Sequence, residues 1–427
     1  MIKAIMALGA VGFLVGAGVM ANRTADLEKS EATSVARARL ATVSPAARQD
    51  IDYPALDARL KRLMEKPSMV GLSVGIVENG RITFLRGYGE TVAGSGEKVT
   101  PQTVFRWASV SKGVASTMVA KLAEQGKVSL GAPVARYSSL RLPAGAEQSA
   151  TVGDMLSHRL GLYRNAYDNK LEEGQDPAFL RRTLAQLNLI CPPGSCWSYQ
   201  NVAYDAASEV VSRGTGDTYQ EAVADMLFRP IGMNSASITR EGLMAAPNWA
   251  RPHSAGRREI ELNDIYYRVP AAGGVNSDIK DLSLWMLAQM GAVPDVVSPR
   301  VLQVIQAPLV KTPGERRRLR KFLERLGDAW YGYGWRSYDY AGHRVVGHRG
   351  GVNGYRALIL FDPARKSGVV AMWNSSTSQP GGLEFEVMDM IYRLPFRDWL
   401  EVDAAVPAAV AEEETDPNSG EPANRSR

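Results

Sequence analysis

Segments with the pattern of β-strands occur near both ends of this 427-residue chain. Near the start, the apolar run 72–77 meets Asn79-Gly80, and apolar residues then continue to Tyr88, which is typical of a strand, a tight turn and a second strand. We therefore expect strands from the two chain ends to share one antiparallel sheet. Four more strand-like segments follow Pro313 and are separated by Gly, Asn-Gly and Asp-Pro breaks: 330–340, 343–348, 355–361 and 367–373.

The middle of the chain has helical periodicity instead. Apolar residues recur at helical spacing in segments 109–125, 179–189 and 202–212. A basic run, 316–321, contains Leu319 and is followed by Phe322, Leu323 and Leu326, which predicts an amphipathic helix with a solvated basic face.

The two ends of the chain differ in composition from the rest. Residues 1–21 begin Met-Ile-Lys, continue as an apolar run and end in Val19-Met20-Ala21, which is typical of a cleaved export signal. The alternative is an uncleaved membrane anchor formed by residues 2–20. Segments 22–50 and 401–427 are polar, the latter acidic, and both are expected to be flexible. We expect an exported, periplasmic protein that touches a membrane only through such an anchor.

Charge and cysteine content exclude several classes of partner. Lys plus Arg number 50 and Asp plus Glu number 45, so the net charge of +5 gives no reason to expect nucleic-acid binding. Cys191 and Cys196 enclose Pro-Pro-Gly-Ser and are expected to form a small disulfide loop in an exported chain. Two thiols cannot build a structural zinc site, and the four histidines lack metal-ligand spacing. We predict no metal and no cofactor.

Two kinds of serine motif compete for the role of nucleophile. Gly71-Leu72-Ser73-Val74-Gly75 matches the Gly-x-Ser-x-Gly elbow, but that elbow needs a helix directly after the serine, and Ser73 lies inside a predicted strand. Ser-x-x-Lys occurs three times. Ser95 falls in a Gly-rich turn, and Ser277 precedes an apolar helix that it is expected to cap. The third serine, Ser109, remains as the candidate.

Ser109 stands at the predicted start of a largely apolar, buried helix. Lys112 follows three residues later on the same helix face, so its amine can approach the serine hydroxyl. Burial favours the neutral amine, which is the form that acts as a base. The alternative is that Ser109 is another helix cap and Lys112 a solvated lysine.

Further motifs favour the catalytic interpretation through a family resemblance. The segment 105–130, which contains Ser109 and Lys112, resembles the first active-site block of class C β-lactamases and their penicillin-binding and esterase relatives. Leu156-Ser157-His158-Arg159-Leu160-Gly161-Leu162 and Pro193-Gly194-Ser195-Cys196-Trp197-Ser198-Tyr199-Gln200-Asn201 resemble the next two blocks. His348-Arg349-Gly350 stands where classical β-lactamases have Lys-Thr-Gly.

The resemblance implies an α/β (α+β) fold of the class C β-lactamase/transpeptidase type, with an antiparallel sheet flanked by helices. The hydrolase domain would span 51–400, with a mainly helical region at about 136–268 inserted into it. Ser109 would form an acyl-enzyme while Lys112 and Tyr199 move its proton. The implied oxyanion donors are the backbone N–H groups of Ser109 and Gly351.

The same resemblance implies that Asn201, His348 and Gly350 contact the substrate, with His348 also in the catalytic set. Near neutral pH an imidazole is mostly uncharged, so a substrate carboxylate would be held less firmly than by lysine. Arg349 is expected to point to the opposite face of its strand. His158 is expected to be a structural histidine at a helix end, bonded to the backbone.

The expected function is hydrolysis of a β-lactam, a D-amino peptide or an ester, with a small-molecule or peptidoglycan-derived substrate. The alternative is a penicillin-binding sensor that is acylated without turnover. The two differ in the lifetime of the adduct on Ser109.

Overall fold

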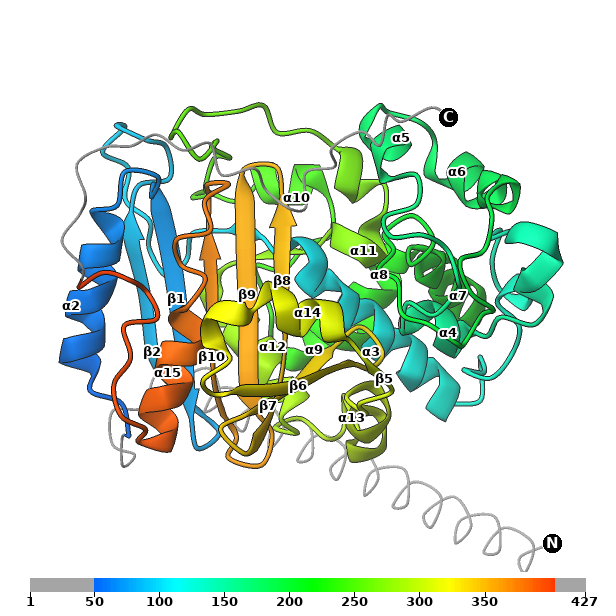
Figure 1. Cartoon of the computed structure of the whole chain (residues 1–427). Helices are drawn as coiled ribbons and strands as arrows, with labels where there is room; N and C mark the ends of the chain where they lie inside the picture. Colours follow the sequence, from blue (N-terminus) through cyan, green and yellow to red (C-terminus); the bar gives the residue numbers. More distant parts are fainter. Residues whose placement is uncertain (1–49, 404–427) are drawn as a thin grey trace, which may run out of the picture.

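The computed structural model describes residues 50–403 and contains one large antiparallel sheet. Its strand order is β2-β1-β10-β9-β8-β7-β6-β5, so the first two strands lie beside the last one (Figure 1). This arrangement confirms the predicted fold class, in which both chain ends supply strands to one sheet. The strands of this sheet are β1 Gly71–Glu78, β2 Arg81–Gly89, β5 Val310–Lys311, β6 Leu326–Tyr331, β7 Arg336–Tyr340, β8 His343–Val352, β9 Tyr355–Asp362 and β10 Ser367–Trp373.

Three sequence predictions concern segments outside the described residues. These are the export signal or anchor at 1–21, nearly all of the linker 22–50 and most of the acidic segment 401–427. Between residues 50 and 403, no helix combines the length and the apolar composition that a membrane span requires.

Helices cover both faces of the sheet. Helices α2 and α15 lie on one face, α3 and α12 lie toward the other, and α4 to α8 form a group at one side of the molecule, next to α3 (Figure 1). The α-helices are α2 Tyr53–Met64, α3 Ser111–Glu124, α4 Val152–Leu156, α5 Asp168–Glu172, α6 Pro177–Thr183, α7 Ala206–Thr215, α8 Tyr219–Val223, α9 Arg229–Ile231, α10 Arg240–Met244, α11 Pro270–Gly273, α12 Ile279–Gln289, α13 Pro299–Ile305, α14 Pro313–Arg318 and α15 Leu383–Tyr392.

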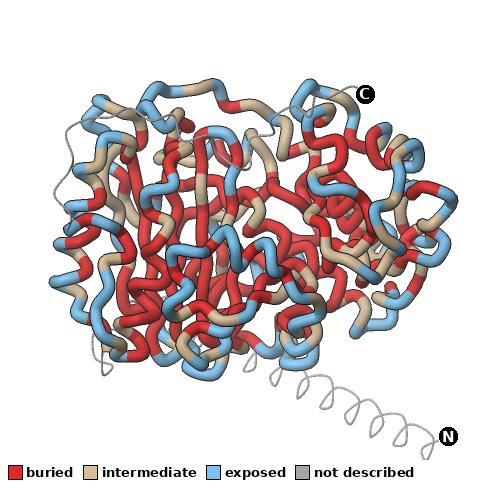
Figure 2. The backbone as a smooth tube through the Cα atoms, in the orientation of Figure 1, coloured by how far each residue is buried: buried red, intermediate tan, exposed pale blue. Residues whose placement is uncertain are grey.

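Strand alternation divides the apolar residues into two cores. In β10, Val369 and Ala371 belong to the core under α2 and α15, whereas Val370 and Met372 belong to the core under α3 and α12. Successive strand residues point to opposite faces, so a strand covered on both sides is apolar throughout. The central strands are accordingly buried along their length (Figure 2).

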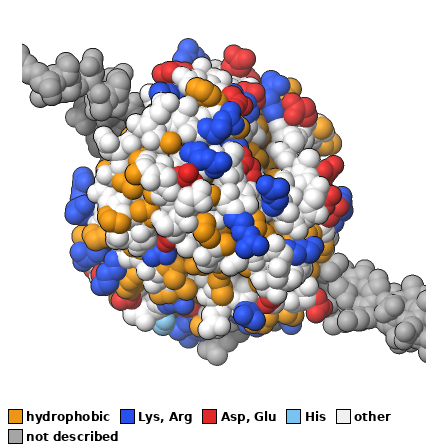
Figure 3. Space-filling model, turned by 90° about the vertical axis from the view of Figure 1, so that its right-hand side faces the viewer, with side chains coloured by type: hydrophobic (Ala, Val, Ile, Leu, Met, Phe, Trp, Pro, Cys, Tyr) orange, Lys and Arg blue, Asp and Glu red, His pale blue; other side chains and the backbone are white. Residues whose placement is uncertain are grey.

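The helical region forms one side of the molecule. On that side, Lys and Arg side chains are interspersed with hydrophobic ones (Figure 3).

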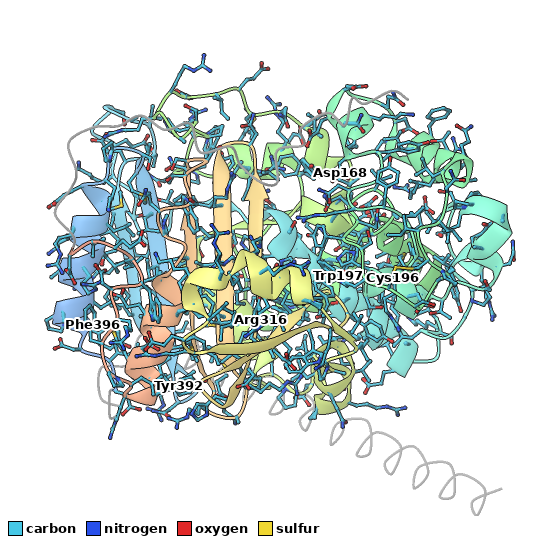
Figure 4. All side chains as sticks on the ribbon, in the orientation of Figure 1. Asp168, Cys196, Trp197, Arg316, Tyr392 and Phe396 are labelled. Atoms are coloured by element: carbon cyan, nitrogen blue, oxygen red, sulfur yellow. A yellow bond between two sulfur atoms is a disulfide. The ribbon has the colours of Figure 1, made fainter. Side chains whose placement is uncertain are left out.

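The two chain ends are joined by an ion-pair cluster as well as by the sheet. Arg59 on α2 is buried and bonds to Glu386 on α15, to Asp398 at 2.6 Å and to Asp403. Phe396 lies over the Arg59 guanidinium, with 4.7 Å between the guanidinium carbon and the ring centroid (Figure 4).

The predicted strand 330–340 is wrong in its extent, because the structure divides it into β6 and β7. The break falls at residues 332–335, where backbone N–H groups are bonded outside the sheet. Tyr333 N–H donates to Ile305 O, and Gly334 N–H donates to Leu156 O. Gly334 also has a φ of +70°, a conformation that favours glycine.

Two local predictions also need correction. Ser277 does not cap the helix that follows it; Asp278 does, and its side chain accepts from the N–H of Asp281. The basic run forms no single helix, because α14 ends at Arg318 and a separate 3₁₀ turn follows. Its basic side chains are exposed, as expected, including Arg316 (Figure 4).

Candidate active site

A short two-stranded sheet positions Ser109. Strand β3 (Phe105–Arg106) pairs with β4 (Asn276–Ser277), and Trp107 extends the connection by donating its N–H to Val275 O. Ala108 then takes a left-handed conformation, with φ 48°, and a 3₁₀ turn (η1, Ala108–Val110) leads into α3. Every residue from 103 to 120 except Ser109 is buried. The fold therefore exposes one hydroxyl at the N-terminal end of an otherwise buried segment.

Lys112 lies one turn beyond Ser109 and is fully buried. Its Nζ donates to Asn201 Oδ1 at 2.7 Å, to the carbonyl oxygen of Ala272 at 2.9 Å and to Ser109 Oγ at 3.3 Å. These three acceptors match the three N–H groups of an ammonium. Burial is therefore only part of the environment of Lys112, because three acceptors also bind its amine.

Tyr199 approaches Ser109 from the other side. Its hydroxyl donates to Ser109 Oγ at 2.9 Å, and its ring centroid lies 4.7 Å from Lys112 Nζ. Tyr199 is half-buried, so its hydroxyl lies between the buried lysine and the exposed side of the site. The structure thus brings together Ser109, Lys112, Tyr199 and Asn201, which the sequence analysis had predicted to meet.

Asp168 is a site residue that sequence reasoning missed. It begins α5, lies almost fully buried beside Asn201, and accepts from Asn201 Nδ2 at 2.7 Å (Figure 4). With Nδ2 engaged by Asp168, the Asn201 amide presents its oxygen to Lys112. Desolvation raises the pKa of Asp168 to about 6, although Asn201 and Lys112 oppose the rise. No motif marks Asp168, since its role depends only on proximity to Asn201.

The third motif lies on β8 and faces the nucleophile through a glycine. A Cβ at Gly350 would lie 2.1 Å from Trp107 O and 3.0 Å from Ser109 N. Any side chain here would collide with the turn that carries Ser109, so the motif requires glycine. Arg349 points to the opposite face, where it pairs with Glu384 on α15, in agreement with the predicted strand alternation.

Gly351 follows at the free edge of β8. Strand β7 pairs with β8 only as far as Arg336↔Gly347. In an antiparallel sheet, the backbone N–H and C=O groups of every second residue point to the same neighbouring strand. Those of Gly347, Arg349 and Gly351 point toward β7, but β7 ends opposite Gly347 and does not reach the other two residues. Within residues 50–403, the backbone N–H of Gly351 therefore has no partner strand on that side, and its role as an oxyanion donor stays a prediction.

His348 differs from the expected substrate contact. The ring is buried, its Nε2 lies 3.1 Å from the Tyr331 hydroxyl, and its Nδ1 lies 2.7 Å from the carbonyl oxygen of Arg349. Both ring nitrogens are therefore bonded within the protein. Burial and the nearby cations Arg336 and Lys112 lower the pKa of His348, which keeps the ring neutral. The ring therefore offers a substrate neither a charge nor a free nitrogen.

A disulfide joins Cys191 and Cys196 just before the Tyr199 segment (Figure 4). Trp197 follows it and packs on Tyr331, with ring centroids 5.9 Å apart. Gly161 lies against this loop, where a Cβ would stand 2.2 Å from Cys191 O. The disulfide loop thus fixes the approach of the chain to Tyr199.

Among residues 50–403, no group of three or more His, Cys, Asp or Glu side chains is arranged to hold a metal ion.

Comparisons with known proteins agree with this arrangement. Residues 56–388 match the protein family described as Beta-lactamase. Unguisins hydrolase ungD' of Aspergillus campestris is 26% identical over 75% of this chain and 61% of its own length. Esterase EstB of Burkholderia gladioli is 30% identical over 49% of this chain and 57% of its own length. The chain thus spans less than two thirds of either relative.

A solved structure shows the same fold. The octameric penicillin-binding protein homologue from Pyrococcus abyssi superposes with a TM-score of 0.72 at 23% sequence identity. The match covers 81% of this chain and 78% of that chain.

Proposed function

This chain belongs to the beta-lactamase family, and we propose that it is a serine hydrolase that works through an acyl-enzyme on Ser109. The observation that carries the proposal is the convergence of two donors on one half-buried hydroxyl. Tyr199 Oη lies 2.9 Å and Lys112 Nζ lies 3.3 Å from Ser109 Oγ. Relatives named as a hydrolase and an esterase support the same reaction class.

In the proposed acylation, Ser109 Oγ attacks the carbonyl carbon and loses its proton. Both Tyr199 and Lys112 donate to Oγ in the structure, so one of them must first give up a proton in order to accept this one. The negative charge on the carbonyl oxygen is stabilised by the backbone N–H groups of Ser109 and Gly351. When the carbon–leaving-group bond breaks, Tyr199 protonates the leaving group, because its hydroxyl lies on the exposed side.

Hydrolysis of the acyl-enzyme repeats these steps with water. Tyr199 accepts a proton from the attacking water, the bond to Ser109 Oγ breaks, and the serine regains its proton. The products are a carboxylic acid and the free enzyme.

The charge of the site favours substrates without a carboxylate on the β8 side. His348 is held neutral with both nitrogens bonded, and Arg349 points away toward Glu384. A β-lactam or peptide carboxylate would therefore find no cation from this motif. We propose uncharged esters and amides, D-amino peptide derivatives among them, as better substrates than β-lactams. We also propose that the protein acts after export, because its cysteines form a disulfide.

The test is intact-protein mass, followed over time, with p-nitrophenyl butyrate and with a chromogenic cephalosporin. Wild type and Ser109→Ala are compared. We expect a transient butyryl adduct and steady nitrophenol release on the wild type only, with slower reaction of the cephalosporin. A persistent adduct without turnover would indicate a penicillin-binding sensor. Undiminished hydrolysis by Ser109→Ala would disprove the assignment of the nucleophile.

A further inference from the structure

Three buried side chains form a hydrogen-bonded chain between the Tyr199 segment and strand β8. His158 Nε2 and His348 Nε2 both lie 3.1 Å from the hydroxyl of Tyr331, the last residue of β6. Tyr331 and His158 are fully inaccessible to solvent, and His348 is nearly so. Of these residues only His348 was assigned to the site above, and the other two have no role in the proposed steps.

The backbone groups at the two ends determine the direction of every hydrogen bond. The N–H of Gln200 donates to His158 Nδ1 at 3.2 Å, so Nδ1 carries no proton and the proton of this neutral ring is on Nε2. At the other end, the Arg349 carbonyl can only accept, so His348 Nδ1 carries the proton and its Nε2 accepts. His158 Nε2–H therefore donates to Tyr331, and the Tyr331 hydroxyl donates to His348.

The first end of the chain holds Tyr199. His158 accepts from Ser198 N–H at its carbonyl oxygen, 2.8 Å away, and from Gln200 N–H at its ring. Both neighbours of Tyr199 are thus bonded to one histidine. The rings of His158 and Tyr199 also pack together, with 4.4 Å between centroids. The sequence predicted a structural histidine bonded to the backbone, and these bonds are present. It did not predict the contact between the rings of His158 and Tyr199.

The second end of the chain holds the free edge of β8. The Arg349 carbonyl lies beyond the last β7 partner and receives its hydrogen bond from His348 instead. Gly350, which contacts the Ser109 turn, and Gly351, the proposed oxyanion donor, follow directly. Movement of this edge would displace the donor from the reacting carbonyl.

We propose that Tyr331 is a positioning residue for the reaction at Ser109, which links the placement of Tyr199 to that of the Gly351 N–H group. The inference rests on the proposed function. Tyr331 touches neither the nucleophile nor a substrate; it acts through His158 at one end and His348 at the other. Because the chain has one consistent set of donors, it also holds both imidazoles neutral.

The surroundings of His348 give this role a pH signature. Arg336 on β7, Lys112 on α3, Glu315 on α14, Tyr199 and His158 are the titratable or charged groups that face the ring. The Tyr331 hydroxyl bonds to the unprotonated Nε2 and therefore favours neutral His348. Its removal leaves Nε2 without this partner, so the pH dependence of the reaction should change.

The test compares Tyr331→Phe with a control, Tyr340→Phe, in the full chain. Tyr340 is also a buried tyrosine, and its hydroxyl bonds to Asp389 and the Phe385 carbonyl in the other core. Each protein is treated with a fluorophosphonate, which labels an activated serine without a matched substrate, from pH 5 to pH 9. Thermal unfolding is measured on the same samples.

For Tyr331→Phe we expect the labelling rate at pH 8 to fall about 10- to 100-fold, as when reacting groups are misplaced or an oxyanion donor is lost. The pH profile of the rate should also change. Tyr340→Phe should lower the melting temperature without either change. An unchanged rate and profile in folded Tyr331→Phe, or the same change in both variants, would overturn the inference.

The two proposals can fail separately. If the wild type is not labelled at Ser109, the proposed function is wrong, and the inference about Tyr331 is wrong with it. If the wild type is labelled and Tyr331→Phe matches it, only the inference is wrong.

Discussion

Asp168 should make the folded protein less stable as the pH rises, which is opposite to the effect of an ordinary paired carboxylate. Asp168→Asn should remove this dependence. Asp168 is almost fully buried, and desolvation raises its pKa to about 6. As the pH rises from 4, the carboxyl ionises first in the unfolded chain. The folded protein therefore loses stability through this window and does not regain it above pH 6.

The size of the effect follows from the pKa. A change of one in pKa corresponds to about 1.4 kcal/mol, so a rise of about two from the ordinary value costs the folded state about 3 kcal/mol at pH 8. Most of this cost develops between pH 4 and pH 8. For a domain of this size, it corresponds to about 3 °C in melting temperature. Asp168→Asn does not titrate, and its amide oxygen can still accept from Asn201.

The assay is thermal unfolding of wild type and Asp168→Asn at pH 4 and pH 8. Any constant effect of the new amide cancels, because only the change with pH is compared. The variant's melting temperature, relative to the wild type, should rise by about 3 °C from pH 4 to pH 8. The same relative melting temperature at both pH values would refute the reasoning.

Asp57→Asn serves as a control of opposite sign. Burial alone would raise the pKa of Asp57, but Lys61, Tyr88 and Arg86 outweigh it and lower the pKa. This carboxylate contributes stability above its unfolded pKa, and that contribution is lost as the pH falls. This loss occurs below about pH 4, so Asp57→Asn should show little relative change between pH 4 and pH 8 and should fall relative to the wild type only as the pH rises through the more acid range.

Two further substitutions test the frame around the nucleophile. Gly350→Ala places a methyl 2.1 Å from Trp107 O and should lower the rate of fluorophosphonate labelling about 100-fold. The control is Gly131→Ala, which should not lower the rate, because a Cβ there meets nothing within 4 Å. Equal rates for the two variants would contradict the contact described at Gly350. Replacing Cys191 and Cys196 together by serine opens a short loop and should lower stability by about 2 kcal/mol in thermal unfolding. If reductant and the double substitution both leave the melting temperature unchanged, the loop does not stabilise the fold.

Sequence patterns predicted the sheet because strand alternation and turn residues are local signals. The hairpin at Asn79-Gly80 has both turn residues in left-handed conformations, as its sequence indicates. The break between β6 and β7 could not be predicted in this way. It depends on carbonyl groups of Ile305 and Leu156, which approach only in the folded chain.

The same distinction applies to the site. Ser109, Lys112, Tyr199 and Asn201 stand in motifs with characteristic spacing, so a resemblance could identify them. Asp168 and Tyr331 stand in no such motif and act through hydrogen bonds to residues that do. The assignment of His348 to the substrate came from its motif position, and only the structure shows that both its nitrogens are bonded elsewhere.

The pairing of β1 with β10 also constrains how the chain can fold during synthesis. About 300 residues separate Val74 from its partner Ala371, so the sheet cannot close until almost the whole chain has been made. The Arg59 cluster, with Glu386 and Asp398, forms equally late. Ser109 and Tyr199 emerge long before β8, and a nascent chain would therefore carry its nucleophile without an oxyanion site. Reactivity should appear only when β8 has taken its place beside the Ser109 turn.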